Sequence, residues 1–76
     1  MNIHVRLLFD LKQHSPTGEP EFNLDLKHAT VTDLMNRLGI PITLRKVVLV
    51  NGRPAHTKQK LQDNDQVVVF LPVTGG

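Results

Sequence analysis

The chain has 76 residues, no cysteine and a formal net charge of +2 at pH 7. A chain of this length forms one domain around one core. The lack of cysteine excludes disulfides, thiolate metal sites and a cysteine nucleophile, and it is consistent with a cytoplasmic protein. No stretch approaches the roughly 20 apolar residues of a membrane-spanning helix, and the first residues do not have the layout of a secretory signal. We therefore expect no membrane partner.

The charges are unevenly distributed along the chain. No acidic residue stands between Asp33 and Asp63, whereas basic residues are frequent there. Such a segment either steers an acidic protein partner toward the chain or is only a solvated surface. Nucleic acid is not an expected partner, because no aromatic side chains alternate with the basic ones to stack on bases. The basic residues of this segment are Arg37, Arg45, Lys46, Arg53, Lys58 and Lys60.

Two strands are predicted in the first part of the chain. Residues 2–11 alternate with period two, which is typical of a strand with one buried face. A turn-rich connector follows at 14–20, and alternation resumes over 22–27. We expect the two strands to form an antiparallel hairpin with a long loop. In the first strand Ile3, Val5, Leu7 and Phe9 share one face, and His4, Arg6, Leu8 and Asp10 share the other.

The spacing then changes to that of a helix over residues 30–39. Apolar residues recur at i, i+3, i+4 and i+7, which places them in one stripe of a helix. Thr30 is a suitable N-cap, and Asp33 can complete a capping box. Gly39 favours a left-handed C-terminal residue, and Pro41 prevents continuation. The stripe consists of Val31, Leu34, Met35 and Leu38.

The last part of the chain predicts three more strands. Residues 47–50 and 53–57 flank Asn51-Gly52, the strongest short hairpin signal, and Pro54 suits an edge strand. A polar turn at 61–65 precedes the final strand at 66–71, whose continuous apolar run indicates a central position. The order predicts an α+β fold, with a mixed sheet of four to five strands and one helix packed on one face.

The sheet face away from the helix is expected to be partly apolar. If Val67 and Val69 face the helix, then Val68 and Phe70 point outward, beside Leu8 and half of residues 47–50. An apolar sheet face that no second layer covers is a candidate docking surface for a partner. The alternative is a set of scattered surface apolar residues, which are common. We take Leu8, Val68 and Phe70 as the candidate docking residues.

The interior of the chain contains no recognisable catalytic or metal-binding motif. The spacings of the four histidines match no ligand pattern, and Asp63-Asn64-Asp65 lacks the later ligands of a calcium loop. Ser15, the only serine, lies in the connector, and there is no glycine-rich phosphate loop. We therefore expect no enzyme activity, no metal and no permanently bound cofactor. The histidines are His4, His14, His28 and His56.

The sequence ends in Gly75-Gly76, after a strand that Pro72 terminates. Glycine leaves the main-chain carboxylate unobstructed and accepts conformations that a narrow active site imposes. The alternative is a frayed end, as is common in small domains. Residues 71–76 can extend about 20 Å, enough to bring the carboxylate into a site on another protein. We expect a folded domain at 1–71 and a tail at 72–76, in which Pro72, Val73, Thr74 and Gly75 thread into that site.

These features together resemble the MoaD/ThiS sulfur-carrier family of ubiquitin-like proteins, which have the β-grasp fold. The resemblance rests on the element order, Asn51-Gly52, residues 61–67, the ending 70–76 and the opening strand at 5–9. It implies that the Gly76 carboxylate is adenylated by an ATP-dependent activating enzyme of the ubiquitin-activating type and converted to a thiocarboxylate. A larger synthase subunit or another acceptor would then take the sulfur. ATP would be used by the activating enzyme.

The branch of the family is indicated by two features that point in different directions. The ending 72–76 is more similar to MoaD, the small subunit of molybdopterin synthase. The short segment 39–46 is nearer to ThiS of the thiamine pathway, and Asn64 stands where the family usually has glycine. The first expectation is a sulfur carrier for molybdopterin synthesis. The alternatives are a carrier for the thiamine pathway or another pathway of the family, and a protein modifier that forms isopeptide bonds to lysines of target proteins. In each case the resemblance implies that Gly76 is the residue that the activating enzyme adenylates.

Overall fold

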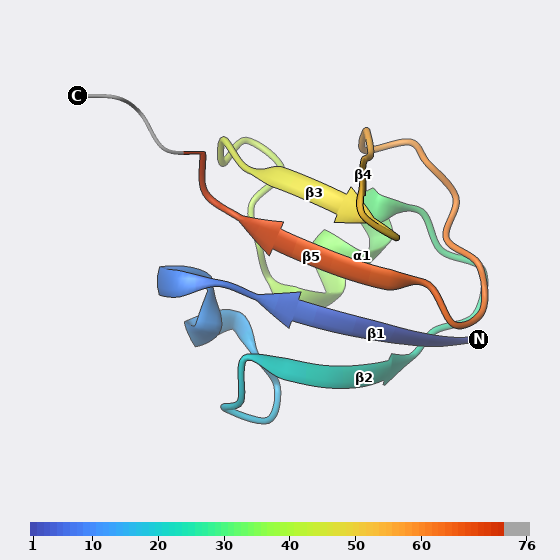
Figure 1. Ribbon diagram of the computed structural model, residues 1–76, viewed down its shortest axis with the longest axis horizontal. Coiled ribbons are helices and arrows are strands. Elements are labelled where there is room, and N and C mark those ends of the chain that lie inside the picture. Colours follow the sequence, from blue (N-terminus) through green and yellow to red (C-terminus); the bar gives the residue numbers. More distant parts are fainter. Residues whose placement is uncertain (73–76) are drawn as a thin grey trace.

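The structure is a computed structural model and describes residues 1–72. The tail residues Val73, Thr74, Gly75 and Gly76 lie outside the described residues. A five-stranded sheet has the strand order β2-β1-β5-β3-β4, and one α-helix packs on one of its faces (Figure 1). In chain order the elements are β1 (Asn2–Leu7), the 3₁₀-helix η1 (Phe9–His14), β2 (Glu21–Asp25), α1 (Val31–Leu38), β3 (Val47–Val50), β4 (Arg53–Pro54) and β5 (Gln66–Phe70).

The sheet is mixed, as the sequence predicts. β1 pairs with β2 in antiparallel and with β5 in parallel orientation, and β5 pairs with β3 in antiparallel orientation. The apolar β5 therefore lies at the centre of the sheet. β4, which contains Pro54, lies at the edge and is shorter than the predicted strand at 53–57. Its edge position is consistent with a residue that cannot donate a ladder hydrogen bond.

The core lies between the sheet and α1. The alternate residues of β1 and β5 that the sequence assigns to the helix side are fully buried, as is most of the α1 stripe. Leu71 is partly buried and packs against this cluster. The predicted inward parity is therefore confirmed for both central strands, up to Leu7 in β1. The fully buried members are Ile3, Val5, Leu7, Val31, Leu34, Met35, Val67 and Val69.

Both ends of α1 are stabilised by the residues predicted from the sequence. The Thr30 hydroxyl accepts a hydrogen bond from the Asp33 amide at 3.3 Å, and the Asp33 carboxylate accepts one from the Thr30 amide at 2.8 Å. This reciprocal pair is a capping box. Gly39 ends the helix with a left-handed φ of 73°. The helix is consequently short, and its single apolar stripe is directed at the sheet.

Two turns at the same end of the sheet are joined through a buried carboxylate. Asn51 and Gly52 have φ of 53° and 81°, as the predicted hairpin turn requires, and Asn64 has φ of 68°. Asp65 is 8% exposed and accepts hydrogen bonds from Asn51 Nδ2 at 2.9 Å and from the Gln62 amide at 2.8 Å. This contact fixes the start of β5 against the β3–β4 turn.

The prediction for residues 8–11 is wrong. β1 ends at Leu7 instead of continuing to 11, and Phe9, expected on the buried face, is 81% exposed. The Leu11 amide donates to the Leu8 carbonyl at 3.2 Å, and this turn brings Leu11 into the core at 2% exposure. The three-residue spacing of a 3₁₀ turn replaces the period of a strand. Leu11 therefore takes the buried place expected for Phe9.

Candidate docking surface beside the end of β5

The sheet face opposite α1 carries an apolar row across β5, β3 and the edge strand β4. Val68 of β5 lies opposite Leu49 of β3, and Leu49 lies opposite Pro54 of β4. Phe70 of β5 lies opposite Val47 of β3. Paired residues in neighbouring strands share a face, so these side chains form one surface. Val68 and Phe70 are partly exposed, as the sequence predicts for the outward parity of this strand.

Leu8 extends this apolar surface past the end of β1. Its amide donates to the Val69 carbonyl at 3.1 Å, which continues the parallel ladder beyond the pair of Leu7 and Val69. Leu8 therefore lies beside Phe70 at the end where β5 finishes. The structure thus brings the candidate docking residues Leu8, Val68 and Phe70 together on one face. Pro72, partly buried, follows two residues after Phe70.

The rest of this face is polar. His4 lies between Asn23 of β2 and Gln66 of β5, and its Nδ1 is 3.1 Å from the Asn23 Oδ1. Arg6 Nε lies 3.3 Å from Glu21 Oε1, with both side chains more than half exposed. A surface ion pair of this kind contributes little to stability. The open face is therefore divided, with polar side chains on β1, β2 and the start of β5, and apolar ones on β3 and the rest of β5.

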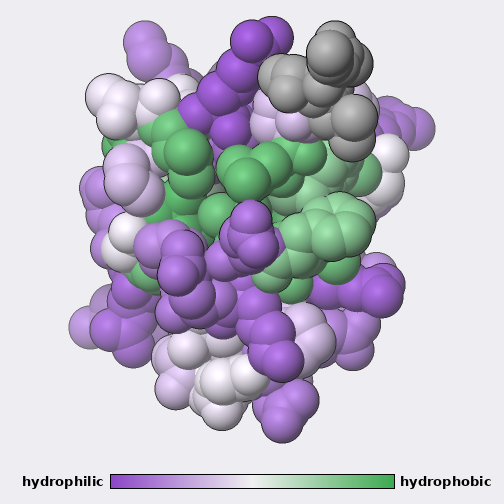
Figure 2. Space-filling model, turned by 90° about the vertical axis from the view of Figure 1, so that its left-hand side faces the viewer, coloured by the Kyte–Doolittle hydropathy of each residue, from purple (hydrophilic) through white to green (hydrophobic). Residues whose placement is uncertain are grey.

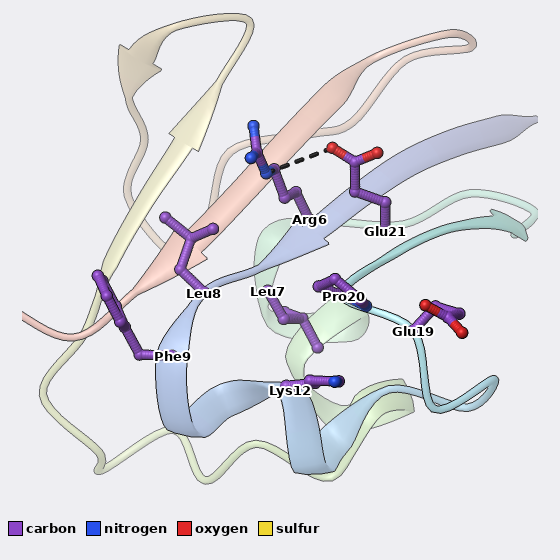
Figure 3. A pocket seen from close by; sticks show the side chains of 8 residues that line it. All are labelled: Arg6, Leu7, Leu8, Phe9, Lys12, Glu19, Pro20 and Glu21. Carbon is purple, nitrogen blue, oxygen red and sulfur yellow. Dashed lines mark ion pairs between the residues drawn. The ribbon is translucent and has the colours of Figure 1, made fainter.

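Apolar side chains also gather on the end of the molecule from which residue 72 leads away. Figure 2 shows them as a green area on this end of the molecule. The most exposed large apolar residues are Phe9 at 81%, Ile42 at 43% and Leu44 at 36%. Phe9 was not predicted as a surface residue. It follows Leu8 directly and lines an open groove with charged side chains (Figure 3). The groove residues are Arg6, Leu7, Leu8, Phe9, Lys12, Glu19, Pro20 and Glu21.

The loop before β3 is held by one lysine of the basic segment. Lys46 Nζ donates to the carbonyls of Pro41, Ile42 and Leu44 at 3.3, 3.2 and 3.1 Å. Partial burial of the ammonium lowers the pKa of Lys46 from 10.5, because removal from water disfavours the charged form. Lys46 therefore shapes the loop that carries the exposed Ile42 and Leu44.

Among residues 1–72, no three histidine or carboxylate side chains lie close enough together to hold a metal ion. Within the same residues, no helix has the length and apolar content needed to cross a bilayer. The predicted tail-threading residues Val73, Thr74 and Gly75, and the predicted sulfur-carrying Gly76, are outside the described part of the chain.

Solved structures with a similar fold include the following three. A putative molybdopterin converting factor subunit 1 from Pyrococcus furiosus is 24% identical, with a TM-score of 0.80, over 96% of this chain and 99% of the other. Small archaeal modifier protein 1 of H. volcanii is 22% identical, with a TM-score of 0.77, over 95% and 98%. A complex of subunits 1 and 2 of a Helicobacter pylori molybdopterin-converting factor matches at 21% identity and a TM-score of 0.67, over all of both chains. These likenesses show the ubiquitin-like β-grasp fold.

Sequence comparison supplies the family. A search of curated proteins found no match. The ThiS family matches residues 12–76, which include the final strand and both terminal glycines. The match covers most of the chain and agrees with the resemblance seen in its motifs. The chain therefore belongs to the ThiS family of small, ubiquitin-like sulfur-carrier proteins.

Proposed function

We propose that this chain carries sulfur as a thiocarboxylate on Gly76 and delivers it for cofactor synthesis, most directly for molybdopterin. The observation that carries the proposal is the position of the apolar half of the open face. Leu8, Val68 and Phe70 adjoin the end of β5, from which the family match continues to Gly76. A partner that covers this surface holds the last residues within reach of its own active site.

The chemistry follows from the low reactivity of a carboxylate. Its negative charge repels nucleophiles, so the carboxylate of Gly76 must first attack the α-phosphorus of ATP and release pyrophosphate. The resulting acyl adenylate then accepts a sulfur nucleophile, and AMP leaves. An ATP-dependent activating enzyme supplies the catalysis for the adenylation, and the present chain is its substrate. Glycine at positions 75 and 76 places no side chain between the acyl carbon and the nucleophile.

A larger synthase subunit would take the sulfur from the charged chain. The Helicobacter pylori structure is a complex of subunit 1 with subunit 2 of its converting factor, which supports a larger partner for a protein of this fold. The apolar surface around Val68 and Phe70 would be covered in succession by the activating enzyme and by this subunit. Pro72, Val73, Thr74 and Gly75 would thread into each active site, and the exchange would take place in the cytoplasm.

Mass spectrometry tests this function. The chain is incubated with ATP, the activating enzyme of the same organism and inorganic sulfide, and its intact mass is then measured. The proposal predicts a mass gain equal to one oxygen-to-sulfur exchange, located in the C-terminal peptide. A variant that lacks Gly76 should show no gain. The proposal would be contradicted if the mass of the full-length chain stays unchanged with an activating enzyme that is shown to be active on a known carrier protein.

A second function is supported by the similarity to small archaeal modifier protein 1. In that case the activated Gly76 would be attacked by a lysine amine of a target protein, and an isopeptide bond would replace the adenylate. Both functions begin with the same adenylation. Peptides that carry the C-terminus of this chain on a lysine, found in cells that express it, would identify the modifier.

A further inference from the structure

Phe9 adopts a backbone conformation that disfavours its own side chain. Its φ is 54°, in the left-handed region that glycine and asparagine accept and that bulky residues rarely enter. The other non-glycine residues with positive φ in residues 1–72 are Asn51 and Asn64, both in tight turns. Phenylalanine is therefore an unfavourable residue for the fold at this position, where asparagine or glycine would serve better.

The ring gains little from burial in return. Phe9 is 81% exposed, and the turn that it occupies serves to bury Leu11. Figure 3 shows the ring on the same side of the chain as the Leu8 side chain, while Leu7 points the other way. An exposed aromatic ring in a strained conformation thus extends the apolar surface of Leu8 and Phe70. The fold needs the turn in order to bury Leu11, but it does not need a phenylalanine there, and a bulky residue kept in a strained conformation is a feature of binding sites.

The segment after Pro72 is short, so an enzyme that binds Gly76 must come close to this end of the domain. Leu8 is hydrogen-bonded beside the end of β5, and Phe9 is its neighbour in the chain. The four residues after Pro72 extend at most about 14 Å. An enzyme that holds the carboxylate of Gly76 must therefore lie against this end of the domain. The exposed ring of Phe9 lies at the same end of the domain.

We propose that Phe9 is a binding anchor for the ATP-dependent activating enzyme, and that its ring inserts into an apolar pocket on that enzyme. Phe9 contributes affinity and not chemistry, because the reacting carboxylate belongs to Gly76. This inference rests on the proposed function, since it requires that an activating enzyme engage the C-terminus. It predicts that affinity for the enzyme and stability of the free chain make opposite demands on residue 9.

Phe9→Asn separates these two demands. Asparagine accepts the left-handed conformation, and the lost ring was almost wholly exposed, so the free chain should unfold at a higher temperature by a few degrees. Adenylation is followed as Gly76-dependent pyrophosphate release by the purified activating enzyme of the same organism. The variant should raise KM at least about tenfold, as expected for the loss of an aromatic anchor. The change in kcat should be small, because the enzyme-bound carboxylate is unaltered.

Two further variants define the interpretation. Phe9→Tyr keeps a ring and should keep KM within about twofold, without the gain in melting temperature. Lys27→Ala, an exposed substitution just beyond the distant end of β2, should change neither quantity. If Phe9→Asn leaves KM unchanged while Val68→Asp raises it, the anchor is refuted and the docking surface remains. If the wild-type chain gives no Gly76-dependent pyrophosphate release, the proposed function itself fails.

Discussion

The amide of Leu8 donates to the carbonyl of Val69 at 3.1 Å, one residue beyond the last regular pair of β1 and β5. This single hydrogen bond aligns the end of the first strand with the end of the last. As a result, an apolar side chain from the start of the chain lies beside Phe70, close to where the C-terminal segment begins. Leu8 and Phe70, which are far apart in sequence, thereby lie side by side on one apolar surface.

Val68→Asp is predicted to weaken the complex with the activating enzyme by about tenfold or more, because it places a charge in an apolar interface. Isothermal titration calorimetry gives the dissociation constant, and thermal unfolding confirms that the variant is folded. Asn23→Asp introduces the same charge on the polar half of the same face. Equal weakening by both substitutions would show that charge alone, and not the apolar surface, governs binding.

The buried carboxylate of Asp65 is predicted to stabilise the fold. Asp65→Ala leaves the Gln62 amide and the Asn51 side chain without their acceptor, at a cost of about 1–3 kcal/mol in the free energy of unfolding. Urea denaturation measures this cost. Asp63→Ala removes an exposed acceptor of the Asn2 amide and should cost less. Asn51→Gly keeps the turn conformation, and a double-mutant cycle with Asp65→Ala should show a coupling of the two side chains.

The capping box is predicted to contribute measurably to a helix of only eight residues. Thr30→Ala removes the acceptor for the Asp33 amide and should lower the free energy of unfolding by about 0.5–2 kcal/mol. Thr43→Ala, in the exposed loop before β3, is the matched control and should change stability by less than about 0.5 kcal/mol. Equal effects in urea denaturation would argue against the cap as the cause.

Lys46 is predicted to affect the pH dependence of stability. Because burial lowers the pKa of Lys46 from 10.5, the folded chain loses this proton at a lower pH than the unfolded chain does. Just below pH 10.5 the unfolded state therefore binds more protons, and this residue makes the free energy of unfolding rise with pH. Lys46→Arg does not titrate there. Across that window, denaturation curves should show the wild type gaining stability relative to the variant; a relative loss would contradict the assignment.

The sequence was sufficient to predict the elements that are set by local chemistry. Alternation in β1 up to Leu7, the helix stripe with its Thr30 and Asp33 cap, and the Asn51-Gly52 turn each depend on neighbouring residues. The outward positions of Val68 and Phe70 followed from strand parity once Val67 and Val69 were assigned to the core. Their grouping with Leu8 could be predicted because β5, apolar throughout, had to be central.

Residues 8–11 could not be predicted from the same pattern. Leu7, Leu8 and Phe9 are consecutive apolar residues, and alternation favours Phe9 as the next buried one. The decision depends on Leu11, which reaches the core only if the chain turns at Phe9. That choice balances burial of Leu11 against an unfavourable φ at Phe9, a tertiary effect that periodicity does not contain.

The most direct test of the central claim is the rate at which the activating enzyme adenylates Gly76 in a single turnover, measured as pyrophosphate release at subsaturating chain. The account predicts rapid release with the wild-type chain, release slowed at least about tenfold with Val68→Asp, and none when Gly76 is deleted. Undiminished release from the chain without Gly76 would contradict it, because the carboxylate that accepts the adenylate would then be another group.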